Sequence, residues 1–131
     1  LGLPVPTAVE GMDLSPFALG EEGPEPEAAF LQGMGTTAAW VDGHEWRALR
    51  DKRYTYAVYR VDREELLYDH QADPYQMCNL AQEPACREVL ERFRALLAER
   101  MAALNDTFEA CTWYRDHWTE DRVIVRTATM S

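Results

Sequence analysis

Apolar and polar residues alternate through the middle of the chain in a pattern typical of β-strands. Between Arg53 and Val61, the positions Tyr54, Tyr56 and Val58 would face one side of a strand and the residues between them the other. Further candidate strands are Ala28–Leu31, Thr36–Val41, Glu45–Arg50 and Leu66–Tyr68. Asp42-Gly43 is a strong signal for a two-residue hairpin, because glycine adopts positive φ at low cost. The pattern predicts an antiparallel meander of four or five strands.

A helical period replaces this alternation after Pro84, a residue that suits the first turn of a helix. Apolar residues then recur at steps of three and four and form one helix face: Val89, Leu90, Phe93, Leu96, Leu97, Met101 and Leu104. A sheet must bury its apolar face, and this helix is the available cover. We therefore predict an α+β fold, with an antiparallel four- to five-stranded sheet covered on one face by one long C-terminal helix.

The two ends of the chain lack either period. Residues 1–27 contain nine prolines and glycines, which predicts an extended acidic arm with turns. The arm carries apolar residues that are expected to pack on another surface: Leu3, Val5, Val9, Met12, Leu14 and Phe17. Residues 105–131 have aromatic residues at irregular spacing, with Arg122–Arg126 as a candidate short strand. The expected division is an arm (1–27), an α+β subdomain (28–104) and an aromatic tail (105–131).

The net charge of −10 is unevenly distributed. Residues 1–46 contain eight acidic residues and no Lys or Arg, whereas the remainder is nearly balanced. Nucleic acids and anionic membrane surfaces attract basic patches, so this distribution argues against both as partners. No apolar run approaches the ~18 residues of a membrane helix.

The three cysteines, Cys78, Cys86 and Cys111, include no C-x-x-C pair, so no zinc motif is present. Their spacing leaves open a disulfide between Cys78 and Cys86, one between Cys86 and Cys111, or three thiols. The chain also contains no G-x-G-x-x-G, H-E-x-x-H or G-x-S-x-G motif. It shows no complete set of nucleophile, base and orienting group, so no catalytic residue and no metal ligand is assigned.

Three segments carry a family resemblance. Glu65–Ala81 resembles the ELYDL-x-x-DP-x-E-x-x-NLA signature near the C-terminal end of sulfatases, and its Asp73-Pro74 pair predicts a turn. Trp46–Ala57 is similar to the family's R-A-V-R-T-x-R-Y-K-Y segment. The N-terminal part, with Val5-Pro6 and Glu10–Pro16, resembles its P-x-x-x-x-G-x-D-L-x-P segment. The order and spacing of the three also match, so residues 1–104 resemble the C-terminal subdomain of a sulfatase, within the alkaline-phosphatase-like hydrolases.

The sequence departs from these family patterns at a few positions. Thr55 stands where the family has Lys, His70 where it has Leu, and Gln76-Met77 where an acidic residue is common. These departures affect the transfer of surface contacts more than the transfer of the fold.

The resemblance implies a parent protein that cleaves sulfate esters with formylglycine and calcium. The catalytic domain would lie N-terminal to these residues, and the chain would complete the fold and form one wall of the substrate cleft. The chain alone is then expected to be inactive, to have that catalytic domain as its partner and to self-associate when isolated. A related phosphoester or phosphonate hydrolase and a non-enzymatic interaction module are the alternatives. Leu1 is not a natural start, which favours a piece of a longer protein; the substrate and the compartment stay open.

Three residues after the predicted hairpin, His44, Trp46 and Arg47, are candidates for substrate binding. The resemblance implies that loops of this subdomain approach the substrate pocket, where a His or Arg would bind a sulfate or a sugar. The alternative is a sheet edge with a packed tryptophan. Likewise, Tyr54, Tyr56 and Tyr59 are better explained as core and cross-strand residues than as a sugar platform.

Two further constellations have simpler explanations than a catalytic site. Cys111–Arg115 has the Cys-to-Arg spacing of the C-x-P-x-R motif that sulfatases oxidise to formylglycine, but Trp113 replaces the proline and the segment follows the long helix. We interpret this spacing as coincidence. Asp69, His70 and Asp73 resemble a metal site on paper, yet a turn accounts for both aspartates without a metal.

Overall fold

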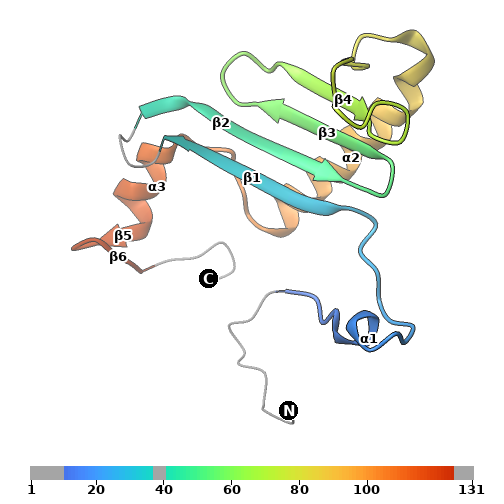
Figure 1. Ribbon diagram of the computed structural model, residues 1–131. Helices are drawn as coiled ribbons and strands as arrows, with labels where there is room; N and C mark the ends of the chain where they lie inside the picture. The colour runs from blue at the N-terminus through green and yellow to red at the C-terminus, as the bar shows by residue number, and fades with distance from the viewer. Residues whose placement is uncertain (1–10, 37–40, 126–131) are drawn as a thin grey trace.

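The fold is a four-stranded antiparallel sheet with a long helix across one face (Figure 1). The computed structural model describes residues 11–36 and 41–125. The strands are β1 (Ala29–Thr36), β2 (Val41–Arg50), β3 (Tyr54–Tyr59) and β4 (Glu65–Asp69), and each pairs with the next in chain order. A 3₁₀ turn, η1 (Pro84–Cys86), leads into the covering helix α2 (Arg87–Ala103). The predicted α+β class is confirmed.

The core lies between the sheet and α2. Register places Leu49, Tyr56 and Leu67 side by side on three neighbouring strands, at most 2% exposed, against the fully buried Phe93 of α2. The Tyr54 and Tyr56 rings lie 6.2 and 6.1 Å from that of Phe93. Tyr54, Tyr56 and Val58 therefore share the core face, as the alternation predicted. This burial of apolar surface is the main stabilising contribution, at roughly 25 cal/mol per Å².

The predicted hairpin at Asp42-Gly43 is wrong, because both residues lie within β2. Gly43 has a φ of 104°, so its conformational freedom is used inside the strand and not to reverse the chain. The predicted strand Thr36–Val41 is also wrong at both ends, since Thr36 ends β1 and Val41 begins β2. The residues between them, 37–40, lie outside the described part of the chain.

The loop after β4 is held by two side chains that bond to the backbone. Asp73 accepts hydrogen bonds from the N–H groups of Met77 (2.6 Å) and Cys78 (2.8 Å), which confirms the predicted turn. Asn79 Oδ1 accepts from the N–H groups of Leu67 (2.9 Å) and Ala81 (3.0 Å). The sulfatase-like signature thus fixes the path from β4 to α2.

Both ends of the described chain hold short elements. The arm contains one helical turn, α1 (Ser15–Ala18), and is otherwise irregular over its described residues, 11–27. After α2 come a helix that the sequence did not predict, α3 (Cys111–Trp118), and a small hairpin, β5 (Thr119–Glu120) and β6 (Val123–Ile124). The candidate strand Arg122–Arg126 overlaps β6, and residue 126 lies outside the described part.

Two expectations about the whole chain concern cysteines and membranes. The three cysteines form no disulfide with one another; Cys78 is exposed and Cys111 is buried. Among the described residues, no helix combines the length and apolar character needed to cross a membrane.

Candidate functional site

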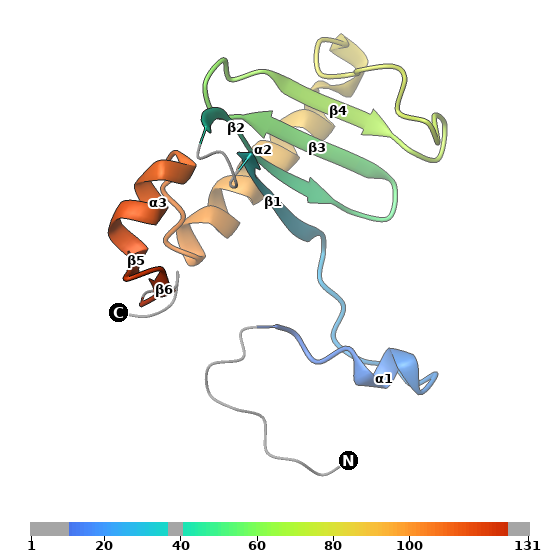
Figure 2. The same cartoon turned by 60° about the vertical axis from the view of Figure 1, so that its left-hand side comes forward.

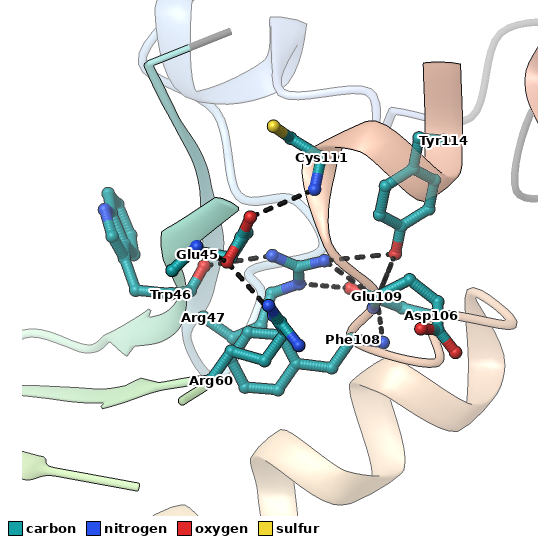
Figure 3. A network of polar contacts seen from close by, with 10 residues as sticks. Glu45, Trp46, Arg47, Arg60, Asp106, Phe108, Glu109, Cys111 and Tyr114 are labelled. Carbon is teal, nitrogen blue, oxygen red and sulfur yellow. Dashed lines mark hydrogen bonds and ion pairs between the residues drawn. The ribbon is translucent and has the colours of Figure 1, made fainter. Parts of the chain in front are cut away.

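Two charged side chains are buried on the helix side of β2. Glu45 and Arg47 are two residues apart, so strand geometry points both to the same face, where they are 0% and 1% exposed. A buried charge is costly unless it is paired and hydrogen-bonded. The partners of both residues come from the segment after α2 and from the end of β3 (Figure 3).

Arg47 is held by Asp106. Its Nη2 donates to Asp106 Oδ1 at 2.9 Å and to the Tyr114 hydroxyl at 3.3 Å, and its Nε pairs with Asp106 Oδ2. Nη1 donates to the backbone oxygen of Trp46 at 3.1 Å. The guanidinium also lies 4.7 Å from the centre of the Phe108 ring. A two-pronged arginine–carboxylate pair of this kind fixes orientation as well as charge.

Asp106 is as fully engaged as its partner. Its Oδ1 also accepts from the Phe108 N–H at 2.9 Å and from the Tyr114 hydroxyl at 3.1 Å. Burial alone would raise the pKa of Asp106, but the Arg47 guanidinium and the Phe108 N–H outweigh it and hold that pKa below its ordinary value. The carboxylate is therefore charged at neutral pH.

The carboxylate of Glu45, on β2, lies at the start of α3. Its Oε1 accepts from the Cys111 N–H at 3.0 Å, and its Oε2 accepts from Gly43 N–H at 2.9 Å and Arg60 Nε at 3.0 Å. Burial opposes ionisation here too, yet these donors keep the pKa of Glu45 below its ordinary value. A carboxylate at the N-terminus of a helix also complements the helix dipole.

These contacts define the Glu45–Arg47 network, which consists of Glu45, Arg47, Arg60, Asp106, Phe108, Cys111 and Tyr114. Two acids face two bases in it, so its charges balance. Its hydrogen bonds join β2 to residues 105–118, and each carboxylate in it is paired with a guanidinium group. The network is a structural clamp that fixes α3 against the sheet.

The clamp shapes a groove beside it. The β1–α3 groove has a volume of about 370 Å³ and is lined by Phe30, Gln32, Met34, Leu104, Asp106, Tyr114 and Trp118. The Trp118 ring packs edge-on against Tyr114, with centroids 4.9 Å apart. The groove thus combines aromatic surface with a few polar groups, as ligand pockets commonly do.

The structure separates the three residues predicted to bind substrate. His44 is exposed, and Arg47 is buried in the network. Trp46 points to the opposite side of β2 from Arg47 (Figure 3), where its ring lies over Gly33: a Cβ there would be 2.2 Å from Trp46 Nε1. Substrate binding by these residues stays a prediction, and the geometry gives Arg47 a structural role.

The structure also accounts for the two other groups of residues considered from the sequence, those around Asp69 and around Cys111. Asp69 binds Arg53 through Nε (2.9 Å) and Nη2 (2.7 Å) and accepts from two loop N–H groups. Cys111 is 1% exposed, and the guanidinium of Arg115 pairs with the neighbouring Asp116. Among the described residues, no three His, Cys, Asp or Glu side chains cluster as metal ligands.

Sequence reasoning missed Glu45, Arg60, Asp106 and Tyr114. The sequence did contain a signal for part of this network. Glu45, Arg47 and Leu49 are two residues apart along one strand, so the two charged residues share a face with the core residue Leu49. Charges in that pattern need buried partners.

Comparison with known proteins identifies the relatives of the chain. No protein-family model matches it. It is 32% identical over 113 residues to an ulvan-active sulfatase from Formosa agariphila, a match that covers 84% of this chain and 21% of the relative. The structure of a 2-O GAG sulfatase matches with a TM-score of 0.70 and 27% identity, over 88% of this chain and 26% of that one. A phosphonate monoester hydrolase from Silicibacter pomeroyi matches with a TM-score of 0.57 and 27% identity, over 76% and 22%.

The chain is related to sulfatases, as its three motifs indicated, and its fold is consistent with a C-terminal sulfatase subdomain. It spans about a fifth of the length of the curated relative that it matches.

Proposed function

We propose that the chain is the C-terminal portion of a sulfatase-like hydrolase that cleaves sulfate esters. The observation that carries the proposal is the 32% identity to an ulvan-active sulfatase over 84% of the chain, together with the shared fold. In this proposal, residues 1–27 end the large domain, residues 28–104 form the C-terminal subdomain, and residues 105–131 are specific to a subgroup.

The bond-breaking chemistry belongs to the large domain of the parent. Sulfate-ester hydrolysis needs a nucleophile at sulfur and a cation to hold the developing charge. Formylglycine and calcium would supply these in the parent. Cys111 is a poor substitute because it is buried and is followed by Trp113 where the oxidation motif has proline. The chain by itself is therefore proposed to be inactive.

The contribution of this chain is to complete the fold and to form one wall of the substrate cleft. The β1–α3 groove supports this role, since it presents Trp118 and Gln32 beside the rigid Glu45–Arg47 network. Residues held by packing and hydrogen bonds position a ligand better than a mobile loop does. Asp106 is fully hydrogen-bonded, so it would shape the wall without binding a substrate.

A second candidate is a phosphonate or phosphoester hydrolase, favoured by the fold match to the phosphonate monoester hydrolase. The two reactions share an anionic ester and differ in the transferred group. The nucleophile motif of the full-length protein distinguishes them, because the sulfatase proposal requires C-x-P-x-R or S-x-P-x-R.

The test uses the full-length protein and three substrates: an aryl sulfate, an aryl phosphate diester and an aryl phosphonate monoester. We expect the sulfate to be cleaved with the largest kcat/KM and a chelator to abolish turnover. Faster cleavage of the phosphonate would support the second candidate. A folded protein that cleaves none of them would support the interaction module.

The cleft-wall role is tested by Trp118→Ala and Gln32→Ala in the same protein. A group that contacts substrate in both ground and transition states raises KM with little change in kcat, here by roughly tenfold. Tyr75→Ala, at an 86% exposed residue in the loop after β4, is the control. Unchanged KM in both groove variants would remove the groove from the cleft.

A further inference from the structure

The four-stranded sheet has two outer strands, β1 and β4, and Figures 1 and 2 show them at its opposite edges. An outer strand directs alternate backbone N–H and C=O groups away from its neighbour in the sheet. These groups can pair with a strand of another chain, so native proteins usually protect them with a covering segment, a proline, charged side chains or a bulge. The two edges of this sheet differ in that protection.

The β4 edge is covered by the loop that follows the strand. Asn79 Oδ1 accepts from the Leu67 N–H at 2.9 Å, and Asn79 Nδ2 donates to the Glu65 backbone oxygen at 3.0 Å. The Leu80 N–H donates to the Leu67 backbone oxygen at 2.8 Å. Every residue of β4 is buried or half-buried. The loop therefore takes the place that a further strand would need.

The β1 edge has no such cover within the described part of the chain. There, the backbone of β1 hydrogen-bonds to β2, and no bond from a loop or a side chain reaches its outer groups. Ala29, Leu31 and Gln32 are exposed. The register with β2 is regular from Ala29 to Met34 and shifts only between Met34 and Thr36. The edge is therefore both accessible and regular over most of its length.

The sequence of β1 also lacks the residues that protect an outer strand. Residues 28–41 contain no Lys, Arg, Asp, Glu or Pro, although the chain has 13 basic and 23 acidic residues. Charged side chains and prolines on an outer strand are the usual means of preventing edge-to-edge pairing. By its composition, β1 is a strand that can pair on both sides.

We infer that the free edge of β1 pairs antiparallel with β1 of a second copy of the protein, which joins two four-stranded sheets into one continuous sheet. A two-fold axis perpendicular to the sheet relates the copies, so the same strand contributes to both sides of the contact. One contact then pairs both free edges. The inference goes beyond the proposed function and applies equally to a sulfatase and to a phosphonate hydrolase.

Charge favours a second copy as the occupant of this edge. Each copy has a net charge of −10, so two copies repel each other over most of their surface. Like charges directly opposite each other across a strand pair are destabilising. When residues 28–41 of two copies pair with each other, no charged side chain lies opposite another. An acidic or basic partner strand would gain no ion pair from β1, whereas a neutral copy loses none.

The dimer contact is compatible with the β1–α3 groove. Phe30, Gln32 and Met34 line that groove, and Phe30 packs against the core beneath α2. These side chains therefore point out of the sheet on its helix side. A partner strand bonds to the backbone within the plane of the sheet. The groove and the contact use different atoms of the same strand.

The test introduces Ala29→Lys with Leu31→Lys into the full-length protein, at two exposed positions that alternate with the groove residues. We expect the dissociation constant of the dimer, measured by sedimentation, to rise at least about tenfold, because the lysines of the two copies face one another. The substitutions bring the net charge closer to zero, so a general charge effect would act in the opposite direction. Ala95→Lys with Ala98→Lys, at two exposed positions on α2, changes the net charge equally and should leave the constant unchanged.

A charge exchange identifies the two strands that meet. The variant with Ala29→Glu and Leu31→Glu should also dissociate, and an equimolar mixture of the Lys and Glu variants should dimerise again. Restored dimers would show that both variants fold and that the two copies of β1 face each other. A mixture that stays monomeric, from variants with wild-type circular dichroism, would overturn the inference.

Hydrogen exchange tests the wild type without any substitution. The outer amides of β1 should exchange at least about tenfold faster when the protein is diluted below its dissociation constant, because the partner strand no longer protects them. A wild-type protein that stays monomeric at its highest soluble concentration would contradict the pairing. Protected outer amides in such a monomer would show that another part of the polypeptide covers the edge. Substrate assays are independent of these results, so a failure of the proposed function leaves the dimer contact standing.

Discussion

Arg47 and Asp106 form a two-pronged ion pair across 59 residues of sequence. Arg47 Nη2 lies 2.9 Å from Asp106 Oδ1, and the two side chains are 1% and 8% exposed. One residue belongs to β2 and the other to the segment between α2 and α3. The pair therefore ties the C-terminal segment to the sheet.

Asp106→Ala is expected to lower the free energy of unfolding by about 3–5 kcal/mol, because it leaves the Arg47 guanidinium buried without its counter-ion. Urea denaturation followed by circular dichroism measures the change. Asp116→Ala, which removes an exposed acid, is the control and should cost less than about 1 kcal/mol. Equal effects of the two substitutions would contradict the clamp role.

Glu45 is expected to make stability depend on pH. Its pKa in the folded protein is below its ordinary value of 4.5. A carboxyl group of this kind contributes stability that is complete above the pKa of the unfolded chain and is lost as the pH falls through the folded pKa. Unfolding free energy should therefore drop as the pH is lowered below 4.5, with Asp106 contributing below its ordinary value of 3.8.

The Glu45→Gln variant tests this contribution. It should be less stable than the wild type at pH 7, and its unfolding free energy should fall less steeply between pH 5 and pH 3, as measured by urea titrations at fixed pH. Glu99→Gln removes an exposed acid of α2 and is the control. If the unfolding free energy of the variant changes with pH as steeply as that of the wild type, the ionisation of Glu45 is not linked to folding.

Phe93→Asp is expected to cost at least about 3–5 kcal/mol, because it removes a fully buried ring and introduces a charge into the core. Phe93 contacts Tyr54 and Tyr56 of β3, so the helix would lose its main anchor on the sheet. The midpoint of chemical denaturation measures the loss. Ala95→Asp puts the same side chain at an exposed position of α2, and an equal effect there would remove Phe93 from its central place in the core.

Gly33→Ala is expected to displace Trp46, because the new Cβ would lie 2.2 Å from Trp46 Nε1. Relief of this contact requires the ring to move, at a cost of about 1–3 kcal/mol. In the Gly33→Ala/Trp46→Ala double variant that cost should vanish, leaving a coupling that a double-mutant cycle measures. Gly11→Ala, where nothing lies within 4 Å, is the control. If the two substitutions change the unfolding free energy additively, the Trp46 ring does not lie over Gly33.

The 131-residue chain should not hydrolyse an aryl sulfate, with or without calcium. Its described residues hold no cluster of metal ligands, and Cys111 is 1% exposed. Mass spectrometry of the Cys111 peptide should show an unmodified thiol, and activity should equal the blank. Cys78, which is exposed, should react with a thiol reagent before Cys111 does. Formylglycine at position 111, with turnover lost in Cys111→Ala, would make residues 111–115 the active site.

Local patterns were sufficient for much of the fold. The alternation of Tyr54, Tyr56 and Val58 predicted the core face of β3, and the recurrence around Phe93 predicted α2. Asp73 marked the turn after β4, where its carboxylate binds two backbone N–H groups. These features depend on residues a few positions apart, so a short window of sequence contains their physical cause.

The same local rules failed where glycine served a distant residue. Asp42-Gly43 has the chemistry of a hairpin, yet Gly43 lies within β2. The predicted strand Ala28–Leu31 ends before Gly33, whereas β1 continues through Gly33, where the Trp46 ring of the next strand occupies the space of a side chain. A glycine in the sequence signals conformational freedom or missing volume, and only the packed structure decides which is used.

The sequence by itself determined the sheet, its covering helix and the relation to sulfatases, since each is encoded in periodicity or in contiguous motifs. Tertiary structure alone decided the clamp between Arg47 and Asp106 and the placement of α3 against β2. The physical reason is that a buried charge selects its partner by proximity in the folded chain. Contacts between residues 59 positions apart leave no period in the sequence.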